Sequence, residues 1–480
     1  MYNKLYISKV DEVYAHIKCE NSDAMELNEY FTFYVPGYKF MPAFRNKVWD
    51  GKIRLFNSQN RQIYYGLIPY LEKFAKEREY TIEFDESVET YDEFSVAEAK
   101  DFIDTLGIPF EVRDYQIDAF IHAVRSRRNL LVSPTASGKS LIIYLIARYL
   151  NCKTLIIVPT ISLVAQLYKD FADYGWDVGS YCHKIYAGKE RETDSQVIIT
   201  TWQSIYKLPR KYFERFNVVI GDEAHQFKSK SLISIMSKLA DAKYRFGFTG
   251  TLDGTQTHKW VLEGLFGASY KIIRTEELMA KGHVAKLDIN VLLLKHPAHK
   301  FENFEEEVQY IINHERRNKF IRNLALDLKG NTLVLFARVE GHGEPLYHMI
   351  NNNTVDERQV FFVHGGVDTK DREKVREITE QENNAIIVAS YGTFSTGINI
   401  KNLHNVIFAS PSKSRIRNLQ SIGRVLRKGN NKTKATLYDI ADDISYKSRR
   451  NYTLNHLIER IKVYNEENFN YDIVNIPLKN

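Results

Sequence analysis

The chain has 480 residues, with 66 Lys and Arg against 60 Asp and Glu, which gives a formal net charge of +6. This length predicts about three domains, and the small positive charge permits an anionic partner without requiring one. The composition, 44% hydrophobic and 26% charged, excludes disorder, collagen and coiled coil as descriptions of the whole chain. Three cysteines, no apolar leader and no long apolar run argue against a disulfide framework, a structural zinc site and a membrane protein. A cytoplasmic protein is expected.

Residues 1–90 are predicted to form a small α+β domain, in which β-like runs at 31–34 and 53–56 surround turn signals and 71–78 form a helix. Basic residues alternate with aromatic ones between positions 38 and 56, which suits phosphate contact combined with base stacking. An equally weighted alternative is a small β-rich core with solvated lysines. The candidate nucleic-acid contacts here are Lys39, Arg45, Lys52 and Arg54.

Beyond an acidic boundary at 85–101, compact apolar runs alternate with helical segments. The runs at 130–132, 155–158, 197–199, 218–220 and 246–248 lack polar alternation, as do those at 333–336, 360–363, 386–388 and 406–408. Such strands are buried on both faces, as in parallel sheets covered by helices. The fold class is therefore α/β, with two tandem parallel-sheet domains at 91–285 and 286–445. A C-terminal helix and tail, 446–480, are expected to pack on the second domain.

The first candidate site is a loop between a strand and a helix, Ser133-Pro134-Thr135-Ala136-Ser137-Gly138-Lys139-Ser140. This context is typical of a phosphate-binding loop, in which backbone N–H groups and a helix N-terminus hold phosphates. Lys139 would reach the β- and γ-phosphates and Ser140 would ligate Mg²⁺. Ser133 replaces the usual first glycine, and a simple helix start is the alternative. The candidate phosphate-binding residues are Thr135, Ala136, Ser137, Gly138, Lys139 and Ser140.

The second candidate site, Gly221-Asp222-Glu223-Ala224-His225, follows the strand at 218–220. Ligands bind at the carboxyl ends of strands in open α/β sheets. Asp222 is predicted to hold Mg²⁺, Glu223 to act as general base, and His225 to couple the nucleotide to a second substrate. A solvated acidic loop is the alternative.

The third candidate site lies in the second α/β domain, where Arg424 and Arg427 are predicted to share one helix face, with Gln420 upstream to position water or phosphate. Arginines that face a nucleotide across a domain cleft stabilise charge in the transition state. Solvated surface arginines are the alternative, and the pairs Arg316-Arg317 and Arg449-Arg450 are interpreted in that way.

In this order the three sites resemble the superfamily-two helicases and translocases of the DExH type, and the resemblance covers about residues 110–445. It implies two RecA-like motor domains that bind ATP and Mg²⁺, with Arg113 and Gln116 in the adenine-reading segment and Gly397 and Asn399 in a second-domain nucleotide motif. The segment Phe248-Thr249-Gly250-Thr251 resembles the coupling motif of these enzymes. Nucleic acid is expected to cross both motors on the sheet edge opposite to ATP. The contacts that the resemblance implies are Pro159, Thr160, Thr201, Trp202, Gln203, Arg338, His364, Gly365, Ser390 and Thr393.

A narrower resemblance, to the phage UvsW-like helicases, rests on the layout and on the segments Phe31-Thr32-Phe33, Pro36-Gly37-Tyr38-Lys39-Phe40 and Trp49-Asp50-Gly51-Lys52-Ile53-Arg54-Leu55. It implies unwinding with 3′-to-5′ polarity, branch migration, fork regression, R-loop removal and annealing. The implied partners are branched, forked, duplex or single-stranded DNA and RNA–DNA hybrids, handled by a monomer in the host cytoplasm. An RNA helicase of the DExH type and a DNA-binding or annealing scaffold with weak ATPase activity remain the alternatives.

Overall fold

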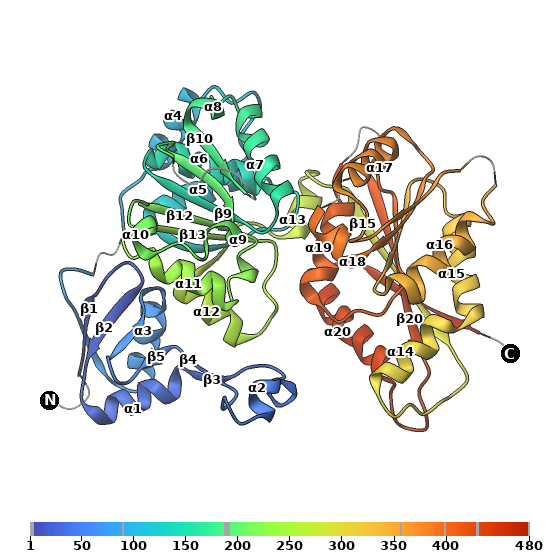
Figure 1. Ribbon diagram of the computed structural model, residues 1–480, viewed down its shortest axis with the longest axis horizontal. Coiled ribbons are helices and arrows are strands. Elements are labelled where there is room, and N and C mark those ends of the chain that lie inside the picture. Colours follow the sequence, from blue (N-terminus) through green and yellow to red (C-terminus); the bar gives the residue numbers. More distant parts are fainter. Residues whose placement is uncertain are drawn as a thin grey trace. The chain divides into compact units, whose positions relative to one another are not determined.

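The structure is a computed structural model that describes residues 4–88, 91–186, 193–355, 358–397, 400–428 and 432–478. Apart from four residues of the phosphate loop, the chain divides into two compact units between Ile272 and Ile273. Each unit contains a parallel sheet with helices around it, and the first also contains the N-terminal region (Figure 1). The predicted fold class is confirmed, whereas the four predicted domain ranges remain predictions.

The N-terminal region is built on a five-stranded mixed sheet in the order β5-β6-β2-β1-β7. Helix α3, which the sequence predicts at 71–78, begins three residues earlier because Pro69 fits the first turn of a helix. It buries Leu71, Phe74 and Ala75. The elements are β1 (Lys4–Lys9), β2 (Tyr14–Lys18), α1 (Asn21–Tyr30), β5 (Phe56–Asn57), β6 (Gln62–Tyr64), η2 (Tyr65–Leu67), α3 (Ile68–Glu77) and β7 (Thr81–Phe84).

A separate two-stranded piece, which we call the N-terminal hairpin, spans residues 32–54. It contains β3 (Thr32–Tyr34), η1 (Tyr38–Phe40), α2 (Pro42–Arg45) and β4 (Lys52–Arg54). The Tyr38 ring stacks on Tyr34 with centroids 4.7 Å apart and meets Phe44 edge-on at 4.8 Å. Gly51 has φ +81°, and a Cβ there would lie 2.3 Å from the Tyr38 ring. The hairpin therefore has a small aromatic core that depends on a glycine.

The sheet of the first unit has seven parallel strands in the order β10-β11-β9-β12-β13-β8-β14. All five predicted strands are present, and the short edge strands β10 and β14 extend the sheet. The strands are β8 (Arg128–Val132), β9 (Thr154–Val158), β10 (Cys182–Ile185), β11 (Val197–Thr201), β12 (Val218–Asp222), β13 (Tyr244–Thr249) and β14 (Ser269–Lys271). The helices are α4 (Val96–Thr105), α5 (Asp114–Ser126), α6 (Lys139–Leu150), α7 (Ile161–Asp173), α8 (Val178–Tyr181), α9 (Trp202–Ile205), α10 (Arg210–Phe213), η3 (Ala224–Gln226), α11 (Lys230–Lys238) and α12 (Gln256–Phe266).

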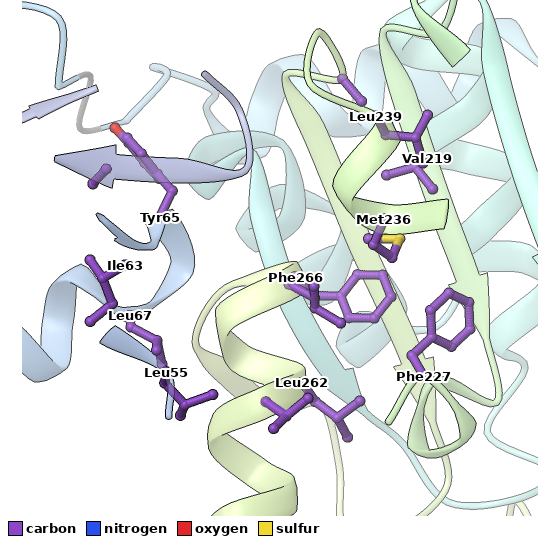
Figure 2. Packing of buried hydrophobic residues seen from close by; sticks show 14 of the residues in the cluster. Leu55, Ile63, Tyr65, Leu67, Val219, Phe227, Met236, Leu239, Leu262 and Phe266 are labelled. Atoms are coloured by element: carbon purple, nitrogen blue, oxygen red, sulfur yellow. The ribbon is translucent and has the colours of Figure 1, made fainter. Parts of the chain in front are cut away.

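The N-terminal region and the first parallel sheet share one hydrophobic core. Leu55, Ile63 and Leu67 belong to the same buried cluster as Leu262 and Phe266 of α12 (Figure 2). Backbones also approach closely, because a Cβ at Gly66 would lie 2.1 Å from the Glu263 carbonyl oxygen. The N-terminal region is thus joined to the first parallel-sheet domain by packing as well as by the chain.

The sheet of the second unit also has seven parallel strands, in the order β17-β18-β16-β19-β20-β15-β21. The four predicted strands are present, but β15, β20 and β21 were not predicted. The strands are β15 (Lys286–Lys295), β16 (Thr332–Phe336), β17 (Val360–Val363), β18 (Ile386–Ser390), β19 (Asn405–Phe408), β20 (Lys434–Asp443) and β21 (Tyr471–Pro477). The helices are α13 (Thr275–Ala280), α14 (Phe304–Asn313), α15 (Glu315–Asp327), η4 (Val339–Gly343), α16 (Glu344–Asn351), α17 (Thr369–Gln381), α18 (Tyr391–Gly397), α19 (Arg415–Val425) and α20 (Tyr452–Glu466).

One of the arginines that we expected to be solvated is instead fully buried in the second unit. The Arg317 guanidinium donates to both carboxylate oxygens of Asp442, at 2.7 and 3.0 Å, and to the Ala409 carbonyl oxygen at 2.9 Å. Burial alone would raise the pKa of Asp442, but Arg317 and His296 hold it at about 2. The prediction that Arg317 is solvated was wrong because its partner, Asp442, lies 125 residues away in sequence.

Across the described residues, none of the helices combines the length and the apolar character needed to cross a membrane.

Candidate nucleotide site and nucleic-acid interface

The phosphate loop has the local structure that its sequence predicts. Strand β8 leads into the loop, and α6 begins at Lys139 with Gly138 as its N-cap in the left-handed region, φ +82°. Ala136 is also left-handed, with φ +70°. That conformation costs a non-glycine residue about 1–2 kcal/mol and is found at functional sites. The loop therefore presents backbone N–H groups and Lys139 at the start of a helix, as phosphate binding requires.

The adenine-reading segment contacts the phosphate loop directly. Gln116 is buried, and its Nε2 donates to the Gly138 carbonyl oxygen at 3.4 Å. The Arg113 backbone N–H donates to Gln116 Oε1 at 3.0 Å, and the Arg113 side chain donates to the Tyr115 hydroxyl at 2.7 Å. A Cβ at Gly138 would lie 2.3 Å from Gln116 Nε2. The structure thus brings Arg113 and Gln116 to the loop, while their role in reading adenine remains a prediction.

The acidic pair lies beside the lysine of the loop. Asp222 ends β12, and Glu223 follows it in the left-handed region, φ +51°. Lys139 Nζ lies 3.9 Å from Glu223 Oε1. In the sheet, β12 and β8 are separated only by β13, so their carboxyl ends deliver both motifs to one place. Two motifs 83 residues apart therefore form one cluster, with one cation and two carboxylates.

Burial raises the pKa of Asp222 to about 6, because the charge of Glu223 adds to the effect of burial while Lys139 opposes both. Because these surroundings disfavour the charged form of Asp222, a cation bound beside its carboxylate would be stabilised. No group of three or more His, Cys, Asp or Glu able to hold a metal ion is found among the described residues. In proteins Mg²⁺ is usually bound through one or two carboxylates, water and substrate phosphates. Asp222 and Ser140 thus fit the magnesium ligation expected of them.

His225 connects the acidic pair to the segment that resembles the coupling motif. Its Nδ1 lies 3.2 Å from Thr249 Oγ1 and 3.4 Å from Glu223 Oε2. The Thr249 hydroxyl donates its proton to the Thr251 carbonyl oxygen at 3.0 Å. Its oxygen is therefore the acceptor in the hydrogen bond with His225, and His225 Nδ1–H is the donor. Burial lowers the pKa of His225, which favours the neutral imidazole. Thr249 ends β13, between the strands of the two nucleotide motifs, and its own carbonyl accepts from the Ser133 N–H at 2.9 Å.

A further residue at this site was missed by the sequence reasoning. The Tyr174 hydroxyl lies 2.7 Å from Ser140 Oγ, within hydrogen-bonding distance. Tyr174 follows the end of α7, 34 residues beyond Ser140, in no recognisable motif. Only the packing of α6 and α7 brings the two together, so no sequence signal could have identified Tyr174.

The candidate nucleotide residues of the second unit lie near α18 and α19. Gln420 and Arg424 are half-buried on α19, and Gly397 ends α18. The expected helix face shared by both arginines is not observed, because α19 ends at Val425 and Arg427 lies in the turn beyond it. Asn399 lies outside the described residues.

The candidate nucleic-acid residues of the first unit follow the carboxyl ends of β9 and β11. Pro159 and Thr160 are half-buried, and the Thr160 hydroxyl caps α7 by accepting from the Leu163 N–H at 3.3 Å. Thr201 ends β11 and is buried, whereas Trp202 and Gln203 open α9. Because β8, β9, β11 and β12 are parallel, these residues and the nucleotide motifs lie at the same sheet edge. The candidate contacts of the first unit therefore do not lie at the end of the sheet opposite to the nucleotide motifs, as we had expected, and the path of nucleic acid across the sheet stays a prediction.

In the second unit the candidate nucleic-acid residues also follow carboxyl strand ends. Arg338, after β16, makes a two-pronged ion pair with Glu305, with N–O distances of 2.7 and 2.6 Å. The Ser390 hydroxyl, at the end of β18, lies 2.8 Å from that of Thr393. The remaining candidates, His364 and Gly365, follow β17.

The basic and aromatic residues of the N-terminal hairpin differ in how far they are packed or exposed. Tyr38 and Phe44 form its core, whereas Phe40 is 77% exposed and Val48 is 81% exposed. The candidate cations differ in their surroundings: Lys39 and Arg45 are exposed, Lys52 Nζ lies 4.9 Å from the centre of the Tyr34 ring, and Arg54 forms an ion pair with Asp50.

Each of three regions of the chain, the N-terminal region and the two parallel-sheet domains, matches a protein-family model. Residues 6–85 match the model "DNA helicase UvsW, N-terminal", residues 109–254 match "Type III restriction enzyme, res subunit", and residues 315–429 match "Helicase conserved C-terminal domain". Two RecA-like parallel-sheet domains with these motifs define a superfamily-two helicase, an enzyme that hydrolyses ATP.

Whole-chain similarity narrows the assignment. The chain is 36% identical to the ATP-dependent DNA helicase uvsW of Enterobacteria phage T4, with 98% of each chain covered. The crystal structure of T4 UvsW matches 99% of this chain and all of its own, at 34% identity and a TM-score of 0.53. A DNA 3′-5′ translocase, XPB2 of Sulfurisphaera tokodaii, is 25% identical and covers 68% of this chain and 82% of its own. The chain belongs to the UvsW family of phage ATP-dependent DNA helicases.

Proposed function

We propose that this DNA helicase remodels branched DNA: it migrates four-way junctions, regresses forks, removes R-loops and anneals strands. The N-terminal hairpin is the observation that carries the proposal. It presents exposed apolar side chains, Phe40 and Val48, beside the exposed cations Lys39 and Arg45. Cations contact phosphates, and exposed apolar side chains pack against bases where a duplex opens.

The attachment of the hairpin supports a mechanical role. Residues 31 and 33, at its base, pack against Trp260 of α12, with ring centroids 5.4 Å apart for Phe31 and 4.9 Å for Phe33. A hairpin held on the same core as the first motor moves with that motor. Strokes of the motor along DNA would thus drive the hairpin into the branch point.

The motor chemistry that we propose uses the residues at the carboxyl edge of the first sheet. Lys139 contacts the β- and γ-phosphates of ATP, and Glu223 activates the attacking water as general base. Asp222 and Ser140 hold Mg²⁺, which neutralises charge on the phosphates when it is bound. His225 links this site to Thr249 and hence to movement on DNA.

The second motor completes the proposed reaction with Gln420, Arg424 and Arg427. These positions match the family motif whose arginines stabilise charge as the phosphate bond breaks.

We further propose 3′-to-5′ movement by a monomer in the host cytoplasm. The name of the Sulfurisphaera relative, a DNA 3′-5′ translocase, supports the polarity. An RNA helicase is the competing function, since the contacts expected of both motors are mainly to the nucleic-acid backbone.

ATPase stimulation tests the substrate proposal most directly. The same preparation is assayed with single-stranded DNA, duplex DNA, a four-way junction and single-stranded RNA at one salt concentration. We expect the junction and single-stranded DNA to stimulate hydrolysis most. Stimulation by RNA alone would contradict a DNA substrate.

The hairpin is tested by point variants, because deleting residues 1–85 would expose the core around Trp260. The double variant Lys39→Gln/Arg45→Gln removes two exposed cations from the hairpin. Lys73→Gln/Lys76→Gln removes two exposed cations from α3 of the same region and serves as the control. We expect only the first to weaken junction binding, and equal affinities for both would refute the role of the hairpin.

A further inference from the structure

A basic cavity of about 840 Å³ lies in the second unit, and its lining contains none of the residues assigned above to nucleotide or nucleic acid. One wall is the segment after β15 and the other is the loop after β20, so the cavity opens at the carboxyl ends of these paired strands. The side chains on which the argument depends are Lys300, Phe301, Tyr446, Lys447, Arg449 and Arg450.

The loop that carries most of these cations is anchored by a buried carboxylate. Glu307 is fully buried and accepts four hydrogen bonds: from Asn451 Nδ2 at 2.8 Å, from the Tyr452 N–H at 2.7 Å, and from the Thr453 N–H and hydroxyl at 2.7 Å each. Asn451 Oδ1 in turn accepts from the Ile444 N–H at 3.0 Å. Both ends of the loop are therefore fixed, and both oxygens of Glu307 are occupied.

Between these anchors the loop forms a tight turn that holds its cations in solvent. Tyr446 and Arg449 exchange two backbone hydrogen bonds of 3.1 Å, which leaves Lys447 and Ser448 at the turn. Lys447 is left-handed, with φ +53°, as such turns require. Its Nζ lies 5.4 Å from the centre of the Tyr446 ring, which is itself 38% exposed. A structured turn thus places exposed cations beside an exposed aromatic face.

The positive charge of the cavity exceeds the negative charge in its lining. Lys300, Lys447, Arg449 and Arg450 are all exposed, and none of the four forms an ion pair with another residue of the described ranges. The one carboxylate in the lining, that of Glu307, is hydrogen-bonded to the loop itself. The cavity therefore suits an anion of more than one charge.

The cavity lies beside the expected nucleic-acid contacts of the second unit, which indicates the kind of anion that it binds. The first turn of α14 carries Glu307 in the cavity wall and, two residues earlier, Glu305, which holds Arg338. Arg338 follows β16, one of the strands whose carboxyl ends carry the expected nucleic-acid residues of this unit. Because all seven strands are parallel, the cavity continues that same edge toward β15.

We propose that the cavity binds the sugar–phosphate backbone of a single DNA strand, with a base stacked on Tyr446 or Phe301. Arginine pairs with phosphate through two parallel hydrogen bonds, and aromatic faces accept unstacked bases of any sequence. The path of DNA across the second motor then extends beyond Arg338 to the loop after β20. The proposal rests on the DNA-helicase function and adds a binding subsite to it.

Salt dependence of oligothymidylate binding, measured by fluorescence anisotropy, tests the subsite. The variant Arg449→Gln/Arg450→Gln removes two cations from the cavity. The control Lys286→Gln/Lys329→Gln removes two exposed cations from the amino ends of β15 and β16, at the opposite sheet edge. In the first variant we expect about tenfold weaker binding at physiological salt and a slope of log K against log salt that is shallower by about 1.5. The control should match the wild type.

The outcomes separate this proposal from the one on which it rests. If the wild type binds with a steep slope and both double variants match it, the subsite is refuted while the helicase function stands. If the wild type neither binds DNA nor shows DNA-stimulated ATPase activity, both fail. For the stacking surface, Tyr446→Ala should weaken binding even at high salt and Tyr446→Phe should not. Equal affinities of these two variants would refute stacking on Tyr446.

Discussion

Truncation of Trp260 to alanine should destabilise the N-terminal region and the first motor together. Trp260 is 4% exposed, and its ring lies 5.7 Å from Tyr30, 5.4 Å from Phe31, 4.9 Å from Phe33 and 4.3 Å from Tyr70, by ring centroids. Removing a buried tryptophan costs about 3–5 kcal/mol, because the cavity left behind collapses only partly. Four partner rings favour the middle or upper part of that range, about 4 kcal/mol.

Urea unfolding gives the measurement. With a denaturant dependence of about 3 kcal/mol per molar, a loss of about 4 kcal/mol lowers the midpoint of the first unit by about 1.3 M. Trp260→Phe keeps a ring in the cluster and should lose less than half of that. Limited proteolysis during the same titration reports which residues become accessible. Early cleavage confined to residues 1–85, with the motor still folded, would refute the shared core.

Three further predictions concern single residues. Gly138→Ala places a Cβ 2.3 Å from Gln116 Nε2 at φ +82°, and a strain of about 1–2 kcal/mol should raise the KM for ATP about tenfold; an unchanged KM would contradict the loop geometry. Burial lowers the pKa of His342 from 6.5 to about 3, so stability falls as the pH drops from 6.5 toward 3, by about 2 kcal/mol at pH 5, and urea unfolding of His342→Asn should lack most of this loss. Thr249→Val removes the hydroxyl next to His225 Nδ1 and should lower the number of base pairs unwound per ATP, whereas Thr249→Ser should not; equal coupling in both variants would contradict the contact.

The two parallel sheets could be predicted because their central strands are uninterrupted apolar runs. Strand β20, by contrast, carries Asp439 and Asp442. Charged residues of this kind are predicted to lie at the surface. Both are buried, because Arg460 pairs with Asp439 at 2.8 Å and Arg317 pairs with Asp442 at 2.7 Å. These partners come from distant helices, so this buried strand could not be predicted from local pattern.

The candidate site likewise contains residues that could be predicted from the sequence and residues that could not. The phosphate loop and the acidic pair are contiguous motifs, so each could be predicted from its own residues. The contact of Tyr174 with Ser140 and the ion pair of Glu305 with Arg338 depend on how separate helices pack. The same holds for the exposed Phe40, since only the packing of Tyr38 on Gly51 decides which aromatic residues form the core of the hairpin.

ATP-dependent strand exchange at a movable four-way DNA junction tests the central claim most directly. The wild type is compared with Lys139→Ala, which lacks the phosphate-contacting ammonium beside Glu223. We predict rapid exchange by the wild type that requires ATP hydrolysis, and none above the spontaneous rate by the variant, although the variant still binds the junction. Equal exchange by the two proteins, or exchange without ATP, would contradict a motor that remodels branched DNA.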